Sequence, residues 1–452
     1  MELEIVRRII EQIIAAHTTA GDYAYRFYLQ YSRPILDGLH LGFDSLFKVF
    51  LFITMLVATS YLIMALAAMM KKKTTTRPVK KGKEPTVTVQ IPTYNELAAI
   101  NCAKRCLAFD YPRERLQIII GDDSSDRSVS AKIDAFAAQY PGRIEVTRRG
   151  NNVGYKPGNL NHMLKYSNGD ILVIFDSDFL PDKDFLRKIT SPFAEDKDIA
   201  VAQARWKIVN FRQNAYSVLG GTITAMCHHL ALSFIDWFKG NSFLCGSAEA
   251  IRKKDLLDIG GWEAGSLTED IECSLRLNKG SKKLVYLEDV DCGCEAPQSF
   301  RDLYRQQMRW SFGVTAAMKK HLGGILRSPK IPIKDKFGIL LFGSGYLFSF
   351  MLFFLTVFGS LAVISNAPAP VDWSRFLSET AFNIIITSGI LLASIVALAK
   401  SRMVKSIPKM LAASLSIGIA VTYFVNIGIL KALFDRKMNW FMLKKNGNRT
   451  VN

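Results

Sequence analysis

The stretch Phe175-Asp176-Ser177-Asp178-Phe179 decides how the rest of this sequence is interpreted. It closes the apolar run 171–175, whose β-branched and aromatic residues indicate a buried strand. Two carboxylates therefore follow directly on a strand, where an α/β sheet presents its ligands. Hard oxygen ligands there suit Mg²⁺ or Mn²⁺, with substrate phosphates in the remaining positions. An acidic loop is the alternative, and the spacing alone does not decide between the two.

The surrounding region alternates between strand-like and helical runs. Helical stretches such as 131–139 separate further strand-like runs at 87–91, 117–120, 144–147 and 199–203. This alternation predicts an α/β domain in which helices cover a mostly parallel sheet.

The composition indicates a membrane protein with an anionic partner. The chain has 452 residues, of which 49% are hydrophobic, a formal charge of +18 and a mean hydropathy of +0.13. Much of the positive charge follows the uncharged stretch 49–70, which is long enough to cross a bilayer. The positive-inside rule then places the residues after it in the cytoplasm. Topology and anionic lipid therefore account for the charge, and no nucleic-acid partner is expected.

Three further apolar stretches follow the α/β region, at 338–365, 381–399 and 411–430. Three complete crossings would put the C-terminal tail outside, but its cationic residues, among them Lys431 and Arg436, indicate the inside. We therefore expect one of the three stretches to be re-entrant or interfacial.

These patterns predict a division of the chain into seven segments. They are an N-terminal amphipathic helical region with an isoleucine stripe (1–44), a transmembrane helix (45–70), a basic cytoplasmic linker (71–84), the α/β domain (85–299), amphipathic interfacial helices (300–335), a C-terminal transmembrane region (336–434) and a basic tail (435–452).

Polar loops follow successive predicted strands. The first carries Thr93-Tyr94-Asn95-Glu96, the second Asp122-Asp123, and a later loop offers Lys156 beside flexible backbone. Because the carboxyl ends of parallel strands meet at one edge, these loops and Asp176 predict a crevice for a nucleotide diphosphate with a bridging metal.

Two later motifs add candidate chemistry. Thr268-Glu269-Asp270 precedes the helical run 271–278, where Thr268 could simply cap the helix and the acids favour its dipole. A carboxylate there could instead deprotonate a hydroxyl acceptor. In Gln306-Gln307-Met308-Arg309-Trp310, the arginine could grip diphosphate oxygens and the tryptophan could stack on a sugar, or both could anchor a membrane interface.

In this order the motifs resemble those of membrane-bound processive family 2 glycosyltransferases, the cellulose, hyaluronan and chitin synthases. The resemblance covers residues 85–312, and Gln306-x-x-Arg309-Trp310 is its most specific part. The runs 173–181, 202–206 and 260–262 are similar to those of cellulose synthase-like mannan, glucomannan and xyloglucan-backbone synthases. Residues 243–247 look like the acceptor-site motif of cellulose synthases, with Leu244 where an aromatic residue is usual.

The resemblance implies a GT-A type fold and an inverting transfer in which Asp270 is the general base, with Glu269 beside it. The nucleotide sugar would be bound by Thr93, Tyr94, Glu96, Asp123, Lys156, Asp176 and Arg309. The acceptor would be bound by Cys245, Gly246, Ser247, Gln306 and Trp310. Asp176 and Asp178 would hold Mg²⁺ or Mn²⁺.

The leading hypothesis is a processive β-glycosyltransferase that polymerises hexose from GDP-mannose or UDP-glucose and passes the glycan across the membrane. The alternative is a non-processive enzyme that transfers one sugar to a lipid acceptor. A homo-oligomer or an accessory subunit would supply helices for a channel. A catalytically inactive scaffold or a transporter is a third reading, which the intact carboxylate set and the absence of paired hydropathy repeats disfavour.

Overall fold

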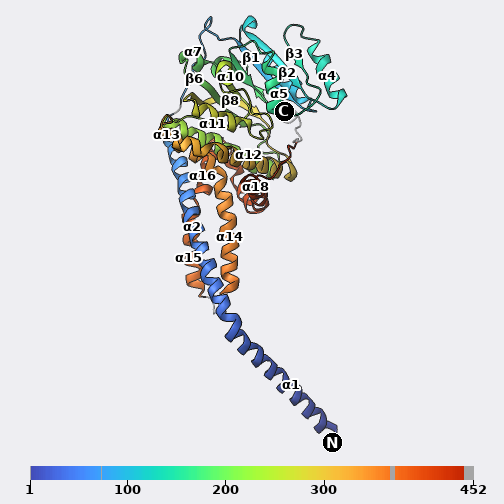
Figure 1. Cartoon of the computed structure of the whole chain (residues 1–452), viewed down its shortest axis with the longest axis vertical. Coiled ribbons are helices and arrows are strands. Elements are labelled where there is room, and N and C mark those ends of the chain that lie inside the picture. The colour runs from blue at the N-terminus through green and yellow to red at the C-terminus, as the bar shows by residue number, and fades with distance from the viewer. Residues whose placement is uncertain (1, 73, 367–371, 442–452) are drawn as a thin grey trace. The chain divides into compact units, whose positions relative to one another are not determined.

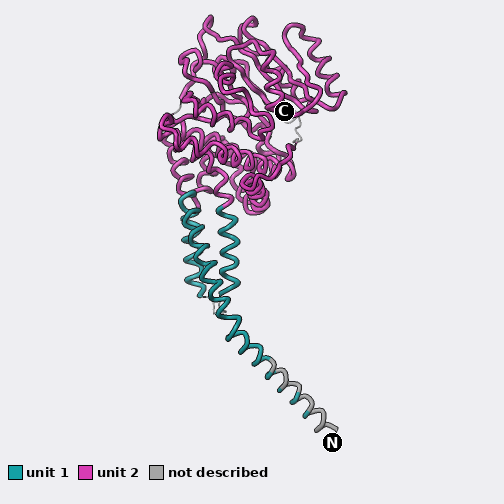
Figure 2. Tube along the Cα trace, in the orientation of Figure 1, with its two compact units in different colours: residues 1–58, 351–387 teal, residues 59–350, 388–452 magenta. Residues whose placement is uncertain are grey.

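The computed structural model describes residues 2–72, 74–366 and 372–441. They fall into two units, which Figure 2 colours separately: residues 1–58 with 351–387, and residues 59–350 with 388–452. The helices have the bounds α1 Glu2–Phe27, η1 Tyr28–Ser32, α2 Arg33–Met70, α3 Ala98–Leu107, η2 Arg113–Arg115, α4 Arg127–Ala137, α5 Tyr155–Leu164, α6 Phe185–Ile189, α7 Ser191–Glu195, α8 Ala215–Met226, η3 Cys227–Ala231, α9 Leu232–Trp237, α10 Lys253–Asp258, α11 Glu269–Lys279, α12 Phe300–Arg327, α13 Ile333–Gly343, η4 Ser344–Tyr346, α14 Leu347–Ser365, α15 Trp373–Thr387, α16 Gly389–Lys400, η5 Val404–Ser406, α17 Ile407–Leu415 and α18 Ile417–Leu433.

The second unit contains an eight-stranded mixed sheet (Figure 1) in the order β3-β2-β1-β4-β7-β6-β8-β5. Its strands are β1 Val87–Thr93, β2 Leu116–Asp122, β3 Glu145–Thr147, β4 Ile171–Ile174, β5 Leu180–Pro181, β6 Ile199–Ile208, β7 Glu249–Arg252 and β8 Lys283–Cys294. The first four in spatial order are parallel, β7 is antiparallel to both β4 and β6, β8 is parallel to β6, and β5 is antiparallel to β8. The predicted α/β class is confirmed, and each predicted strand corresponds to an observed one.

Apolar side chains alternate between the two faces of the sheet and are covered on both. One face packs Val89, Ile118 and Val173 against α3 and α4, and the other packs Ile119 and Leu172 against α5 and α11. Burial of both faces explains why these strands are nearly continuous hydrophobic runs in the sequence. It also fixes the carboxyl ends of β1, β2 and β4 side by side at one edge.

Within the described part of the chain, three helical segments are long and apolar enough to cross a membrane: Gly21–Met70, Ala215–Trp237 and Ile333–Ser365. Two bent pairs, Trp373–Thr387 with Gly389–Lys400 and Val404–Leu415 with Ile417–Leu433, raise the number to five if each is one span. In Ala215–Trp237, 78% of the apolar window is buried inside the protein, against 22% and 11% in the other two. That segment, which the sequence analysis did not single out, is therefore an interior helix by its packing against α16 and α17.

The two ends of the chain are described only in part. Residues 2–27 form helix α1 as expected, but the predicted isoleucine stripe (Ile5, Ile9, Ile10, Ile13 and Ile14) lies outside the residues whose side chains are described. The predicted basic tail is described as far as residue 441, and the rest of it lies outside the described residues.

Close packing between β2 and α5 gives a stability prediction. A methyl group on Gly121 would lie 2.1 Å from Asn159 Oδ1 and 2.7 Å from Met163 Sδ, so Gly121→Ala should destabilise the fold by about 1–3 kcal/mol. Thermal melting in lipid nanodiscs measures the loss. Gly323→Ala is the matched control, because no atom lies within 4 Å of its new methyl group on helix α12. That variant should gain about 0.5–1 kcal/mol, and equal melting of the two variants would contradict the packing.

Candidate active site

A cleft of about 170 Å³ opens where the carboxyl ends of β1, β2 and β4 meet. Every residue predicted for the site lines it except Ser247, which is fully buried behind it. The lining residues among the predictions are Thr93, Tyr94, Glu96, Asp123, Lys156, Asp176, Asp178, Cys245, Gly246, Glu269, Asp270, Gln306, Arg309 and Trp310. The fold thus gathers residues from widely separated parts of the sequence into one place.

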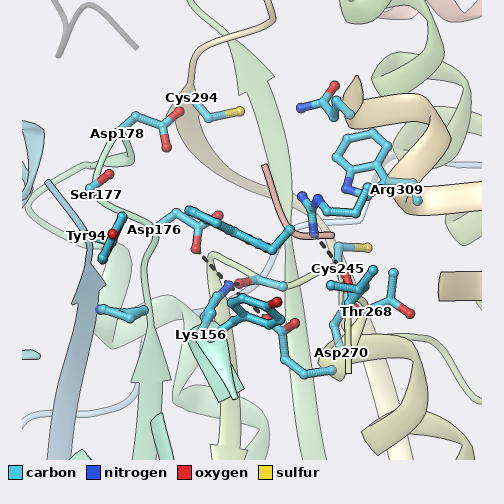
Figure 3. Close-up of a pocket in the computed structure, with 18 of the residues that line it drawn as sticks. Tyr94, Lys156, Asp176, Ser177, Asp178, Cys245, Thr268, Asp270, Cys294 and Arg309 are labelled. Atoms are coloured by element: carbon cyan, nitrogen blue, oxygen red, sulfur yellow. Dashed lines mark hydrogen bonds and ion pairs between the residues drawn. The ribbon is translucent and has the colours of Figure 1, made fainter. Parts of the chain in front are cut away.

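Strand β4 delivers the two aspartates. Asp176 and Asp178 follow its last residue, and Figure 3 shows Asp176 turned toward Lys156 and Asp178 beside Cys294. The hydroxyl of Ser247 accepts a hydrogen bond from the backbone N–H of Asp176 at 2.8 Å. Asp178 is 1% exposed and accepts from the backbone N–H of Glu295 at 3.2 Å. The backbone of Asp176 and the carboxylate of Asp178 are therefore held in place by neighbouring loops.

A single lysine neutralises this part of the cleft. Lys156 Nζ lies 2.7 Å from Asp176 Oδ1 and 3.1 Å from Glu269 Oε1, and it also donates to the carbonyl of Gly246. Burial alone would lower the pKa of Lys156, but the carboxylates of Asp176 and Glu269 outweigh it and raise the pKa above its usual range. The ammonium group is consequently a fixed positive charge.

Asp270 is the second residue of α11 and follows Glu269 directly. Burial raises the pKa of Asp270 to about 7, and the neighbouring Glu269 carboxylate adds to the rise. Such a carboxyl group accepts a proton near neutral pH, as a general base must. The alternative reading of this motif as a simple helix cap is wrong in one respect: Thr268 makes no side-chain capping hydrogen bond, and its buried hydroxyl has no partner among the described residues.

Helix α12 brings Gln306, Arg309 and Trp310 to the opposite wall. The three residues are spaced i, i+3 and i+4, so they share one face of the helix. Arg309 Nη1 donates to the carbonyl of Leu267 at 2.9 Å, which ties the arginine to the loop before Asp270. Trp310 lies 6.4 Å from Trp206 between ring centroids, so two indoles border this end of the cleft.

Sequence reasoning missed Arg149. Its guanidinium makes a bidentate interaction with the Asp123 carboxylate, in which Nε lies 3.1 Å from Oδ1 and Nη2 donates to Oδ2. Burial raises the pKa of Asp123, and Arg149 offsets part of that rise. The signal was the pair Arg148-Arg149 directly after the third predicted strand, at the same sheet edge as the other polar loops.

Sequence reasoning also missed Trp440 and Phe441, which belong to the predicted basic tail yet line the cleft. The Trp440 ring stacks on Tyr155 with centroids 6.0 Å apart and meets Tyr94 edge-on at 5.9 Å. Phe441 lies under the Arg305 guanidinium at 4.6 Å. Two adjacent aromatic residues in an otherwise basic tail were the available signal.

Asp176 and Asp178 fit a divalent ion by their donor chemistry. Among the described residues there is no group of three or more His, Cys, Asp or Glu side chains that could hold a metal. Mg²⁺ and Mn²⁺ are, however, often held by one or two carboxylates, with substrate phosphates and water completing the coordination. The pair therefore suits an ion that arrives with a diphosphate, in competition with Lys156 for Asp176.

Three comparisons place this geometry among known proteins. Residues 85–313 match the family described as "Glycosyltransferase like family 2". A probable glucomannan 4-beta-mannosyltransferase 11 of Oryza sativa subsp. japonica is 30% identical over 263 residues, which cover 56% of this chain and 45% of that protein. The solved mannosyltransferase PcManGT from Pyrobaculum calidifontis, in complex with GDP-Man and Mn²⁺, matches with a TM-score of 0.58 and 17% identity over 89% of this chain and 100% of that one. The likeness confirms the GT-A type fold.

The competition for Asp176 gives a prediction about metal binding. Without metal, Lys156→Met should lower the free energy of unfolding by about 2 kcal/mol, because Asp176 and Glu269 lose their counter-ion. The melting temperature should fall accordingly. The substitution should also enlarge the melting-temperature gain on adding Mn²⁺, because Asp176 becomes available. Lys188→Met is the control, since it removes only an i, i+4 pair with Asp184. Equal Mn²⁺ shifts in both variants would remove Asp176 from the metal site.

Proposed function

This chain belongs to glycosyltransferase family 2 and is a glycosyltransferase, and on that premise we propose that it is an inverting, processive β-glycosyltransferase that extends a hexose polymer from a nucleotide-diphosphate sugar. The observation that carries the proposal is the position of Asp270, a carboxyl group with a pKa of about 7. Asp270 shares one cleft with Asp176 and Arg309, which are the residues proposed to bind the donor diphosphate, and with the indole of Trp310.

The chemistry follows from these positions. Asp270 takes the proton of the acceptor hydroxyl as that oxygen attacks the anomeric carbon, and the diphosphate leaves from the opposite face of the sugar. Inversion needs one base and an in-line attack, so Asp270 requires no second carboxylic acid. Lys156 and Arg309 place positive charge beside the departing diphosphate. Mg²⁺ or Mn²⁺ held by Asp176 and Asp178 would neutralise further charge on the leaving group.

Two features favour GDP-mannose as the donor and a glycan as the acceptor. The rice relative is named a glucomannan mannosyltransferase and PcManGT is solved with GDP-Man. Trp310 and Trp206 border the acceptor end, and aromatic faces suit the apolar faces of sugar rings. A growing chain could thus remain bound between transfers.

We infer that the cleft is cytoplasmic. The cationic residues after α2 obey the positive-inside rule for that side. Lys71 at the end of α2 binds Asp236 at 2.7 Å and Glu288 at 2.9 Å, and Lys400 at the end of α16 lies 3.4 Å from Glu288. Two helix ends are thereby anchored to β8 of the catalytic domain.

The position of Trp440 supports the side of the membrane that the charges of the tail indicate. Trp440 lies in the cleft, so it is on the same side of the membrane as Asp270. We propose that α17 and α18, bent by 58°, form the re-entrant or interfacial stretch. α18 packs closely along α12: the two helices approach so nearly at Gly428 that a methyl group there would lie 2.3 Å from Ser311 Oγ.

The test is product analysis with the full chain in lipid nanodiscs. Mn²⁺ or Mg²⁺ and a panel of GDP- and UDP-sugars are supplied, and labelled product is sized. A high-molecular-weight product from GDP-mannose is expected, with Asp270→Asn reducing turnover by about 10³-fold or more while nucleotide binding persists. Near-normal turnover by Asp270→Asn would overturn the assignment of the base. A single-sugar product that extracts with lipid would instead establish the non-processive alternative, which the small number of candidate spans favours.

The proposed base also predicts a pH dependence. Asp270 must be deprotonated to accept a proton, so kcat should fall about tenfold per pH unit below roughly pH 7. Glu269→Gln removes a neighbouring negative charge, which lowers the pKa of Asp270 and moves this limb to lower pH. Asp184→Asn on the surface should leave it in place. A limb that does not respond to Glu269→Gln would mean that another group titrates.

A further inference from the structure

Glu249 is a buried carboxyl group that the proposed chemistry does not use. It is the first residue of β7, is 1% exposed, and pairs across the sheet with Gln203 of β6 and Ile174 of β4. A carboxyl group at the centre of a sheet is costly unless its oxygens are bonded. The hydrogen bonds of Glu249 therefore indicate its role.

Its bonds go to the backbone of the loop just before β7, which we call the acceptor loop (residues 244–248). Glu249 Oε2 accepts from the N–H of Gly246 at 2.8 Å and from that of Cys245 at 3.1 Å. Gln203 also binds this loop. Its Oε1 accepts a hydrogen bond from the backbone N–H of Cys245 at 2.7 Å, and its Nε2 donates to the carbonyl of Ser247 at 3.0 Å. Two adjacent side chains thus fix three successive residues of the loop.

The acceptor loop in turn touches both ends of the reaction site. Gly246 has a φ of +89°, and a Cβ there would lie 3.3 Å from Asp270 Oδ2 and 3.6 Å from Lys156 Nζ. The next residue, Ser247, bonds the backbone N–H of Asp176 at 2.8 Å. A shift of this loop would therefore move the base, the lysine and the first aspartate relative to one another.

We propose that Glu249 is a positioning residue for sugar transfer, which holds the acceptor loop by accepting the N–H groups of Cys245 and Gly246 and so fixes Asp270 against the diphosphate end of the cleft. The inference rests on the proposed role of Asp270 as the base. Glu249 acts through the loop backbone and needs no contact with substrate.

The charges around Glu249 agree with a neutral acceptor. Burial raises the pKa of Glu249 well above its usual range, and Asp270 and Glu269 add to the rise. Lys156 and the hydrogen bond from the Gly246 N–H oppose it without cancelling it. The thiols of Cys245 and Cys273 are the other titratable groups nearby, and burial raises the pKa of Cys273 while a bond to Cys227 and burial raise that of Cys245. A protonated carboxyl group keeps a carbonyl oxygen that accepts two N–H groups. A further negative charge near Asp270, in addition to that of Glu269, is thereby avoided.

Two substitutions separate geometry from charge. Glu249→Gln keeps the length of the side chain and an oxygen that can accept both N–H groups, so kcat should stay within about twofold of wild type and the acid limb of the pH profile should not move. Glu249→Asp keeps the acid but shortens its reach, so kcat should fall about 100-fold, as misplacement of about 1 Å can cause, with little change in the KM for the donor. A role that depends on negative charge predicts the opposite order.

The experiment uses the full chain in nanodiscs with GDP-mannose, Mn²⁺ and the wild-type product as readout. Wild-type transfer that Asp270→Asn abolishes must come first, because its failure would remove the proposed function and not the role of Glu249. With that established, a large loss of kcat in Glu249→Gln overturns the inference, as does a shift of its acid limb to lower pH. Melting curves accompany each variant. If Glu249→Asp does not fold, the Gln variant alone decides.

Discussion

One buried cation makes the cleft possible. The carboxylates of Asp176 and Glu269 pair with the ammonium group of Lys156, whose charge also opposes the rise in the pKa of Asp270. Without it, burial and mutual repulsion would drive these acids to take up protons or to separate. Lys156 lies on α5, whose own packing against β1 and β2 is fixed by the sheet. The position of one helix relative to one sheet edge therefore sets the electrostatics on which donor binding and base strength both depend.

Most of the parallel half of the sheet could be predicted from the sequence, because strands buried on both faces leave continuous apolar runs such as 171–175. The other half was harder. β7 is four residues long and antiparallel to both neighbours, and it carries Glu249 in its first position. β8 carries charged residues among its apolar ones because its partly exposed positions bind lysines and arginines from helices and from β6. Such pairing across the fold leaves no local pattern.

The candidate site divides in the same way. Carboxylates after strands, such as Asp123 and Asp176, could be recognised because their residue type and position each point to ligand chemistry. Arg149 and Glu249 could not, because their roles show only in their contacts: Arg149 binds the carboxylate of Asp123, and Glu249 binds the backbone of the acceptor loop. Trp440 is the extreme case: helices α13 to α18 separate it from α12 in the sequence, and only the fold returns it to the cleft opened by β1 and β4.

The buried apolar segment Ala215–Trp237 also affects how the protein can be made. Helices α16 and α17 cover it, yet they are synthesised more than a hundred residues later. At a translation rate of about 5–20 residues per second, the segment waits on the order of ten seconds or longer for its partners. Throughout that interval it has the length and hydropathy of a membrane-crossing helix. The native packing therefore requires that this segment stay available to α16 and α17 until they are made, so its topology depends on the order of synthesis as well as on final stability.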